Sequence, residues 1–438
     1  MRLSEPELAL LARIEAARTA AAPRSYGQVT SVVGLSVTVA GVPGRVGDLV
    51  RIGAGAGTVL AEVVALDGDR LSCLPLGPLT GVGRDDPVLG TGEPLRITVG
   101  PHLRGRVLDG LGRPIDGGPP LTGPGTPASC DSVSVENEAP SPLGRGLVTE
   151  PLSLGVRAID TLTPCGRGQR MGIFAGSGVG KSSLLSMITR GTDAEISVIA
   201  LVGERGREVK EFLHNDLGPE GMARSVVVVA TSDQPPLVRL RAGFVATRIA
   251  EWFRDAGSDV LLLMDSLTRT AMAQREVGLS VGEPPATRGY PPSVFALLAR
   301  LLERAGPAAR GTITGLYTVL VNGDDHNEPI ADAARSILDG HIVLDRRLAA
   351  MGHFPSIDVL ESISRVTGAV TTPQQRATAT RLRRLLAAHR GKVSDVDATR
   401  CENCGTPFPK IALAQPGTAS DAAPSGSDGG SPAAVAGH

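Results

Sequence analysis

The chain has 438 residues and carries 44 Lys and Arg against 45 Asp and Glu, so its formal net charge is −1. A nearly neutral chain is not expected to bind a nucleic-acid polymer through bulk charge. Its length and its hydrophobic content of 42% suffice for the cores of two or three domains. Lysine occurs only at Lys181, Lys210, Lys392 and Lys410, so a lysine in a motif carries more information here than an arginine does.

The N-terminal segment and the cysteines bear on the cellular compartment. Glu5, Glu7 and Glu15 lie where a secretory signal would need an apolar core. No apolar run approaches the roughly 18 residues that cross a bilayer. The five cysteines are sparse and odd in number, which fits a reducing cytosol better than a disulfide scaffold. We therefore expect a cytoplasmic protein.

Residues 3–22 predict a helix, because Leu8, Leu11 and Ala12 fall on one stripe and Pro23 ends the pattern. A helix that stands before the first domain can dock a partner or pack on its own chain, and the residues themselves favour neither.

Residues 24–98 predict a small β-barrel, since short runs of Val, Leu and Thr alternate with Gly, Asp and Pro turns at spacings of about 8–12 residues. Tyr26 is the only aromatic residue of this segment, and its acidic and basic residues balance. The segment therefore lacks the stacking surface and the basic groove that single-stranded nucleic acid requires, and we expect no nucleic-acid binding. The expected strands are 29–33, 35–40, 48–52, 57–65 and 71–75.

Residues 99–150 form a connector rich in Gly and Pro, after which the pattern changes. In residues 151–370, continuous apolar runs alternate with helical ones, which predicts an α/β core with a parallel sheet covered on both faces. Residues 371–415 are expected to be helical, with a basic helix over 376–389, and the low-complexity residues 416–438 are expected to be disordered. The expected strands are 171–175, 196–202, 226–231, 260–264 and 313–320.

The strongest local motif is AGSGVGKS at residues 175–182, which follows an expected strand and precedes an expected helix. This context is typical of a nucleoside-triphosphate loop, where glycines let backbone N–H groups face phosphate oxygens at a helix N-terminus. Lys181 can reach the β- and γ-phosphates, and the Ser182 hydroxyl can bind Mg²⁺. Ala175 stands where the motif usually has its first glycine, a small departure. The expected ATP-binding residues of the loop are Gly176, Ser177, Gly178, Val179, Gly180, Lys181, Ser182 and Ser183.

Two carboxylates follow expected strands. Asp265 ends the run 260–264 and can act on Mg²⁺, a role compatible with capping the next helix. Glu204 follows the run 196–202 and can orient and deprotonate the attacking water. Spacing alone does not separate Glu204 from Glu208, and a solvated charged turn is an equal alternative.

Several long, ordered segments resemble one family, and together with the barrel they cover about residues 25–385. The chain is similar to the flagellum-specific ATPases of the protein-export apparatus, which belong with the type III secretion ATPases and are related to the catalytic subunits of rotary ATP synthases. The AGSGVGKS form resembles the flagellar branch more than the virulence branch. The resemblance implies a RecA-like parallel-sheet core with a P-loop, preceded by a β-barrel and followed by a short, divergent helical region. The matching segments are 103–117, 167–185, 200–212, 261–306 and 328–366.

The resemblance also implies roles for single residues. Glu204 matches the catalytic glutamate of a Gly-Glu-Arg motif, Arg205 matches a γ-phosphate contact, and Arg269 lies on a segment that faces the same phosphate. Phe354 matches the aromatic residue that stacks on adenine, with a plain core aromatic as its alternative. Arg365 matches the arginine finger that reaches the nucleotide of a neighbouring subunit, and only the motif distinguishes it from the other arginines.

Because the family forms six-membered rings, the resemblance implies a homohexamer that hydrolyses Mg-ATP and energises export of unfolded flagellar proteins. The implied partners are a regulatory stalk-like protein at the N-terminal helix (1–23), the export gate, and export substrates with their chaperones. The implied location is cytoplasmic, peripherally associated with the inner membrane at the export apparatus.

The match to the family fades near residues 384–389, so either the C-terminal domain has diverged or the reading frame changes there. Cys401 and Cys404 resemble half of a zinc ribbon, but zinc normally takes four ligands, and two incidental cysteines are the favoured interpretation. Cys165 is expected to pack rather than to react.

Other functions remain as alternatives. A catalytic subunit of a rotary ATP synthase or ion pump is one, against which the AGSGVGKS loop and the GYPPSVF segment argue. A hexameric RNA translocase is another, against which the neutral barrel, poor in aromatic residues, argues. A non-catalytic copy is disfavoured by the presence of Lys181, Glu204 and Asp265.

Overall fold

The structure is a computed structural model, and it describes residues 13–14, 26–122, 130–321 and 328–394. It divides into two compact units, residues 1–386 and residues 387–438. Arg13 and Ile14 are helical. The rest of the predicted N-terminal helix, the pair Cys401 and Cys404, and the predicted disordered tail lie outside the described residues.

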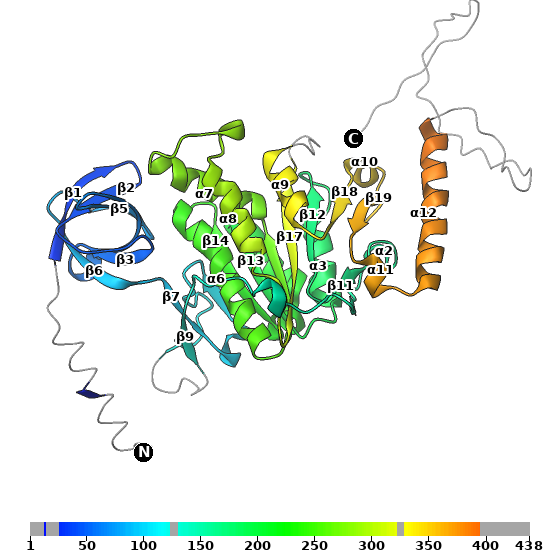
Figure 1. The fold of residues 1–438 in the computed structure, drawn as a ribbon, viewed down its shortest axis with the longest axis horizontal. Coiled ribbons are helices and arrows are strands. Elements are labelled where there is room, and N and C mark those ends of the chain that lie inside the picture. Colours follow the sequence, from blue (N-terminus) through cyan, green and yellow to red (C-terminus); the bar gives the residue numbers. More distant parts are fainter. Residues whose placement is uncertain (1–12, 15–25, 123–129, 322–327, 395–438) are drawn as a thin grey trace, which may run out of the picture. The chain divides into compact units, whose positions relative to one another are not determined.

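Six strands at the beginning of the described chain close into a β-barrel in the order β1-β2-β5-β4-β3-β6 (Figure 1). Alternate side chains along these strands point inward, and valines fill most of the interior. Five strands confirm the predicted runs. The sixth, β6, closes the barrel by pairing with β1 and β3, and its Gly and Pro residues hide it from a search for apolar alternation. The strands are β1 (Tyr26–Val33), β2 (Ser36–Ala40), β3 (Asp48–Ile52), β4 (Val59–Asp67), β5 (Arg70–Pro75) and β6 (Pro87–Pro94).

The predicted connector contains two short strands, β8 (Val107–Asp109) and β9 (Asp131–Ser134), and a third, β7 (Arg96–Val99), ends where the connector begins. β7 pairs with β9 in a separate two-stranded sheet, whereas β8 pairs in parallel with β14 at the edge of the main sheet. Arg106 and Asp116 form an ion pair at 2.7 Å that closes the turn after β8. The connector therefore extends the main sheet by one strand.

The core is a nine-stranded sheet in the order β19-β18-β12-β17-β15-β13-β14-β8, with β16 paired to β17. All pairs are parallel except β18 with β19 and β16 with β17. The five strands expected from the apolar runs are β12, β13, β14, β15 and β17. The further bounds are β12 (Arg170–Ala175), β13 (Ile196–Glu204), β14 (Ser225–Thr231), β15 (Asp259–Asp265), β16 (Gly306–Pro307), β17 (Thr312–Leu320), β18 (Gly340–Leu344) and β19 (Ile357–Ser364).

Helices cover both faces of this sheet, as the continuous apolar strands predict. Val198 and Ala200 of β13 belong to the cluster that includes the buried faces of α6, α7 and α8. Ile199 and Leu201 of the same strand point the other way, into the cluster that includes α3. The longer helices are α3 (Lys181–Gly191), α6 (Pro236–Asp255), α7 (Leu267–Ser280), α8 (Pro292–Leu302), α9 (Pro329–Ile337) and α12 (Pro373–Ser394).

The helix α12 confirms the basic helix that was predicted over 376–389. Among the described helices, none combines the length and the apolar character that crossing a membrane requires. The short elements are β10 (Pro151–Leu152), β11 (Cys165–Gly166), α2 (Arg157–Leu162), α4 (Gly206–Glu211), a π-helical turn (Phe212–Leu217), α5 (Gly218–Ala223), α10 (Arg346–Ala350), α11 (Thr367–Val370) and 3₁₀ turns at Gly55–Gly57, Pro101–Leu103, Pro142–Gly144 and Thr287–Gly289.

A fully buried ion pair joins the connector to the core. Arg304, just after α8, donates to Glu251 of α6 through Nε at 2.7 Å and Nη2 at 2.8 Å. Arg304 Nη1 also donates to the carbonyl of Val135 at 3.2 Å, and Asn137 Nδ2 donates to Glu251 at 2.7 Å. The charges neutralise each other inside the protein, and their remaining donors and acceptors hold residues 135–137 in place.

Glu251→Gln is expected to lower the free energy of unfolding by about 3 kcal/mol, because it leaves the Arg304 guanidinium buried without a neutralising charge. Urea denaturation followed by circular dichroism measures the change. Glu195→Gln is the matched control, since Glu195 pairs with Arg104 at the surface at 3.3 Å and its loss should cost less than about 1 kcal/mol. Equal effects of the two variants would contradict the prediction.

Candidate active site

The phosphate loop turns at the carboxyl end of β12 and leads into α3. Gly178 and Gly180 have φ values of 76° and 88°, a backbone region that favours glycine. A Cβ at Gly180 would also lie 3.2 Å from the ring of Phe354. Gly180 caps α3, so the unpaired N–H groups of the first helical turn are available to an anion at the loop.

Lys181 forms an ion pair with Asp265, the last residue of β15. Asp265 is buried, and its Oδ1 accepts a hydrogen bond from Thr318 Oγ1 at 2.7 Å. The cap of α7 is Ser266, whose Oγ accepts from the Arg269 N–H at 3.3 Å. Ser266 therefore takes the helix-capping role considered for Asp265, whose carboxylate remains in the pocket beside the phosphate loop.

Glu204 is the last residue of β13, and only 7% of its surface is exposed. The preceding residue, Gly203, has a φ of 71°, and a Cβ there would lie 2.7 Å from Arg269 Cδ. Without that Cβ, Arg269 packs onto the strand end, where its Nη1 donates to the Gly203 carbonyl at 2.6 Å. Its Nε lies 3.4 Å from Glu204 Oε1 and is buried without a hydrogen-bond partner.

The surroundings of Glu204 make it a weak acid. Burial raises the pKa of Glu204 to about 7, and the charge of Asp265 and a hydrogen bond with Glu208 act in the same direction. The same hydrogen bond lowers the pKa of Glu208 below its ordinary value. A carboxyl group poised near neutral pH suits a general base, and this favours Glu204 over the more exposed Glu208.

These groups surround a pocket of about 500 Å³. Arg205 lies at its solvent side, with an exposed side chain that pairs with Glu208 at 3.1 Å. Val179 is buried and does not line the pocket, and neither Phe354 nor Arg365 lines it. The predicted site residues that do line it are Gly176, Ser177, Gly178, Gly180, Lys181, Ser182, Ser183, Glu204, Arg205, Asp265 and Arg269.

Phe354 lies against the phosphate loop, outside the pocket. The residue is 60% exposed, although its ring lies 3.2 Å from where a Cβ on Gly180 would be, so it is not the plain core aromatic considered above. Two residues later, Ser356 Oγ donates to the carbonyl of Val179 at 2.5 Å. This contact anchors the segment that carries Phe354 to the loop, with aromatic surface available to a ligand.

Arg365 lies elsewhere. It directly follows β19, and pairing of Ser364 with Gly340 places it at the amino end of β18, whereas the phosphate loop follows the carboxyl end of β12. The Arg365 side chain is exposed, and its Nη2 donates to the carbonyl of Arg335 at 3.3 Å. The structure thus brings Lys181, Glu204, Asp265 and Arg269 together in one chain, but not Arg365.

Two polar contacts at the site were not anticipated from the sequence. Thr318, whose hydroxyl donates to Asp265, could have been identified from the sequence, because it is a polar residue near the carboxyl end of an apolar strand. Ser356 could not, because its only distinguishing property is its contact with Val179. Cys165 is buried, and burial raises the pKa of its thiol to about 12, which agrees with the expected packing role.

Known proteins resemble this chain over most of its length. Residues 155–364 match the ATP synthase alpha/beta family, nucleotide-binding domain. A flagellum-specific ATP synthase of Bacillus subtilis is 52% identical over 369 residues, which cover 84% of this chain and 83% of that protein. A type 3 secretion system ATPase of Xanthomonas euvesicatoria is 51% identical over 374 residues, which cover 85% and 83%.

Solved structures agree with these sequence matches. The assembled ATPase EscN from the enteropathogenic E. coli type III secretion system superposes with a TM-score of 0.79 at 46% identity, covering 84% of this chain and 87% of EscN. EscN in complex with its central stalk EscO gives a TM-score of 0.78 at 45% identity, covering 86% and 89%. With its β-barrel, parallel-sheet core and phosphate loop, the chain belongs to the family of flagellum-specific and type III secretion ATPases, and it is an ATPase of that family.

Proposed function

We propose that this chain hydrolyses Mg-ATP in a homohexameric ring, and that hydrolysis energises export of unfolded flagellar proteins through a type III export gate. The observation that carries the proposal is the convergence of Lys181, Asp265 and Glu204 beside the phosphate loop in one pocket. The chain is about equally similar to flagellar and to secretion relatives, so the flagellar assignment rests on the form of the loop, AGSGVGKS.

The residues present fit a magnesium nucleotide. The Ser182 hydroxyl and the Asp265 carboxylate both face the pocket and are the hard oxygen donors that Mg²⁺ prefers. The buried Arg269 Nε has no hydrogen-bond partner and can donate to an anionic oxygen. We assign Ser182 and Asp265 as the residues that would hold the ion. Bound there, Mg²⁺ would neutralise charge on the phosphate oxygens.

The hydrolytic roles follow from position and charge. The phosphate loop binds the phosphates through its N–H groups, and Lys181 turns from Asp265 to the β- and γ-phosphates. Glu204 orients the attacking water and accepts its proton. Arg205 and Arg269, on the same side of the pocket, stabilise the charge that develops on the transferred phosphoryl group.

The remaining two residues act at the edges of the site. Phe354 presents an exposed ring next to the phosphate loop, where it can stack on adenine. Arg365 lies at the amino end of β18, whereas the phosphate loop of the same chain lies at the carboxyl end of β12. It can therefore act only in a site on another subunit. A homohexameric ring, in which each subunit supplies a loop and an arginine, accounts for this separation.

The assembly is proposed by analogy with EscN, which is described as assembled and in complex with a central stalk. We propose a stalk-like regulatory partner for the N-terminal segment 1–23, and the export gate, export substrates and their chaperones as further partners. The location that follows is cytoplasmic, at the inner-membrane export apparatus.

Lys181→Ala is expected to abolish ATP hydrolysis, because no other lysine lines the pocket among the described residues. Phosphate release from the purified variant measures this. Lys210→Ala, an exposed lysine of α4 outside the pocket, is the control and should retain the wild-type rate. Turnover by the Lys181 variant would refute the assignment of the site.

The pH dependence of kcat/KM should report Glu204. Its pKa is raised to about 7, so the fraction in the carboxylate form, which accepts the proton, falls as the pH falls through 7. Below that pH, kcat/KM should decrease about tenfold per pH unit. Glu208→Ala removes the hydrogen bond that raises this pKa and should move the acid limb to lower pH. An unmoved limb would show that another group controls the rate.

Arg365→Ala should retain nucleotide binding and lose at least about 1,000-fold in kcat, the low end of what arginine fingers contribute. Hydrolysis and binding of a fluorescent nucleotide analogue are measured at concentrations where mass determination shows the ring. Arg190→Ala, an exposed arginine at the end of α3, is the control. Full activity of the assembled Arg365 variant would contradict the finger role.

A further inference from the structure

The backbone around Arg365 is held far more firmly than its side chain. Arg365 N–H donates to the carbonyl of Asp339 at 2.9 Å, while the one hydrogen bond that the guanidinium makes within the described residues is longer, at 3.3 Å to the Arg335 carbonyl. An arginine that acts on a neighbouring subunit needs such an arrangement, with a fixed origin and a side chain that can extend. Catalytic groups must lie close to the productive geometry, because a displacement of about 1 Å can cost about 100-fold in rate.

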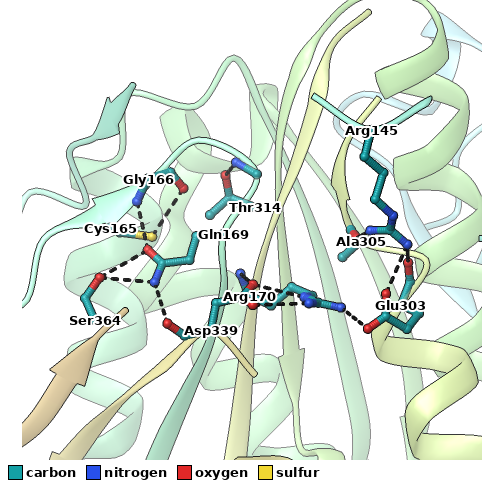
Figure 2. Close-up of polar contacts among 11 residues, drawn as sticks. Arg145, Cys165, Gly166, Gln169, Arg170, Glu303, Ala305, Thr314, Asp339 and Ser364 are labelled. Atoms are coloured by element: carbon teal, nitrogen blue, oxygen red, sulfur yellow. Dashed lines mark hydrogen bonds and ion pairs between the residues drawn. The ribbon is translucent and has the colours of Figure 1, made fainter. Parts of the chain in front are cut away.

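The Asp339 carbonyl accepts a second hydrogen bond, from the side chain of Gln169 at 3.0 Å. The same Nε2 donates to Ser364 Oγ at 3.1 Å. Gln169 therefore binds both Asp339, which accepts from the Arg365 N–H, and Ser364, which precedes Arg365 in the chain. At its other end, Gln169 Oε1 accepts from the N–H of Gly166 at 2.9 Å (Figure 2). Gln169 is completely buried, and all of its amide atoms are used.

The Asp339 side chain is fixed as well. Arg170 donates to the Asp339 carboxylate through Nε at 3.0 Å and Nη2 at 3.1 Å. The other nitrogen of the Arg170 guanidinium reaches Glu303 at 2.5 Å, and Glu303 pairs with Arg145 at 3.1 Å (Figure 2). Both carbonyl and carboxylate of Asp339 are therefore held by residues at the start of β12.

We propose that Gln169 is a positioning residue for Arg365: together with Asp339 it sets the place from which the guanidinium enters the site of the neighbouring subunit. This inference rests on the proposed function, since it requires the ring and the role of Arg365 in it. Gln169 lies at the amino end of β12 and does not line its own subunit's nucleotide pocket. Its effect on hydrolysis is exerted in the neighbouring site.

The test replaces Gln169 by methionine, which keeps the length of the side chain and removes both N–H donors. We expect kcat to fall at least about tenfold, with the KM for ATP and the affinity for a fluorescent nucleotide analogue changed less than about twofold. Thr314→Val is the matched control, because Thr314 Oγ1 accepts from Gly168 N–H at 2.8 Å in the same turn (Figure 2), whereas Asp339 and Ser364 accept hydrogen bonds from Gln169. An equal loss of kcat in Thr314→Val would overturn the inference, because it would show a general effect of the turn.

Mixed rings separate an effect on the neighbour from an effect within the subunit. Gln169→Met subunits keep an intact phosphate loop, and Lys181→Ala subunits keep an intact Arg365. At an interface where a Gln169→Met subunit supplies the phosphate loop and a Lys181→Ala subunit supplies Arg365, the shared site is complete. The mixture should therefore hydrolyse ATP faster than either variant alone, as should a mixture of Arg365→Ala with Lys181→Ala.

The outcomes distinguish this inference from the proposed function. If mixing with Lys181→Ala restores ATP hydrolysis to Arg365→Ala but not to Gln169→Met, Gln169 acts within its own subunit. The inference then fails, while the ring mechanism stands. If neither is rescued, the ring mechanism fails, and the inference with it. Ser364→Ala removes one of the Gln169 contacts but keeps the amide and its hydrogen bonds with Asp339 and Gly166. It therefore allows the measurement should Gln169→Met not fold. It should show a smaller loss of kcat with the same rescue, and wild-type kcat in Ser364→Ala would then overturn the inference.

Discussion

Parallel strand pairing is the constraint on which the nucleotide site depends. β12, β13 and β15 run in one direction, so their carboxyl ends meet at one edge of the sheet. Lys181 follows the first of these strands, Glu204 ends the second and Asp265 ends the third. Lys181 and Asp265, 84 positions apart in the chain, form an ion pair there. The burial of apolar side chains on both faces of the sheet holds this edge in place.

The same edge gives two carboxyl groups different properties. Asp265 has Lys181 and the Thr318 hydroxyl as partners. Glu204 is also buried, but its nearest cation is 3.4 Å away, and the charge of Asp265 disfavours its ionisation. A buried carboxyl group whose pKa is raised, next to a carboxylate that is paired with a cation, is typical of sites in which one group binds and the other exchanges a proton. Position, more than residue type, separates the two roles.

The strand β19 runs antiparallel to β18 and connects the side of the sheet where the parallel strands end with the side where they begin. Its amino end lies near the phosphate loop, where Ser356 binds the Val179 carbonyl. Its last residue, Ser364, lies opposite Gly340, with Arg365 next in the chain. Between Gly340 and Leu344, β18 spans roughly 13 Å at about 3.3 Å per residue. One strand therefore leads from the vicinity of a subunit's own phosphate loop to the arginine that we assign to the site of its neighbour.

Local sequence determined much of this protein. The apolar runs identified the five central strands because strands buried on both faces need apolar side chains throughout, and the AGSGVGKS motif located the phosphate loop because its glycines and lysine act through local geometry. The strands β6 and β8 escaped prediction, since one is interrupted by Gly and Pro and the other has three residues, and pairing partners distant in the chain stabilise both. The resemblance to the family had already selected Glu204 over Glu208, whereas the burial of Glu204, the helix cap at Ser266 and the contacts of Thr318, Ser356 and Gln169 were decided only by the tertiary structure. Burial and hydrogen bonding of these side chains depend on segments that folding brings together, and no spacing along the chain encodes which segments those are.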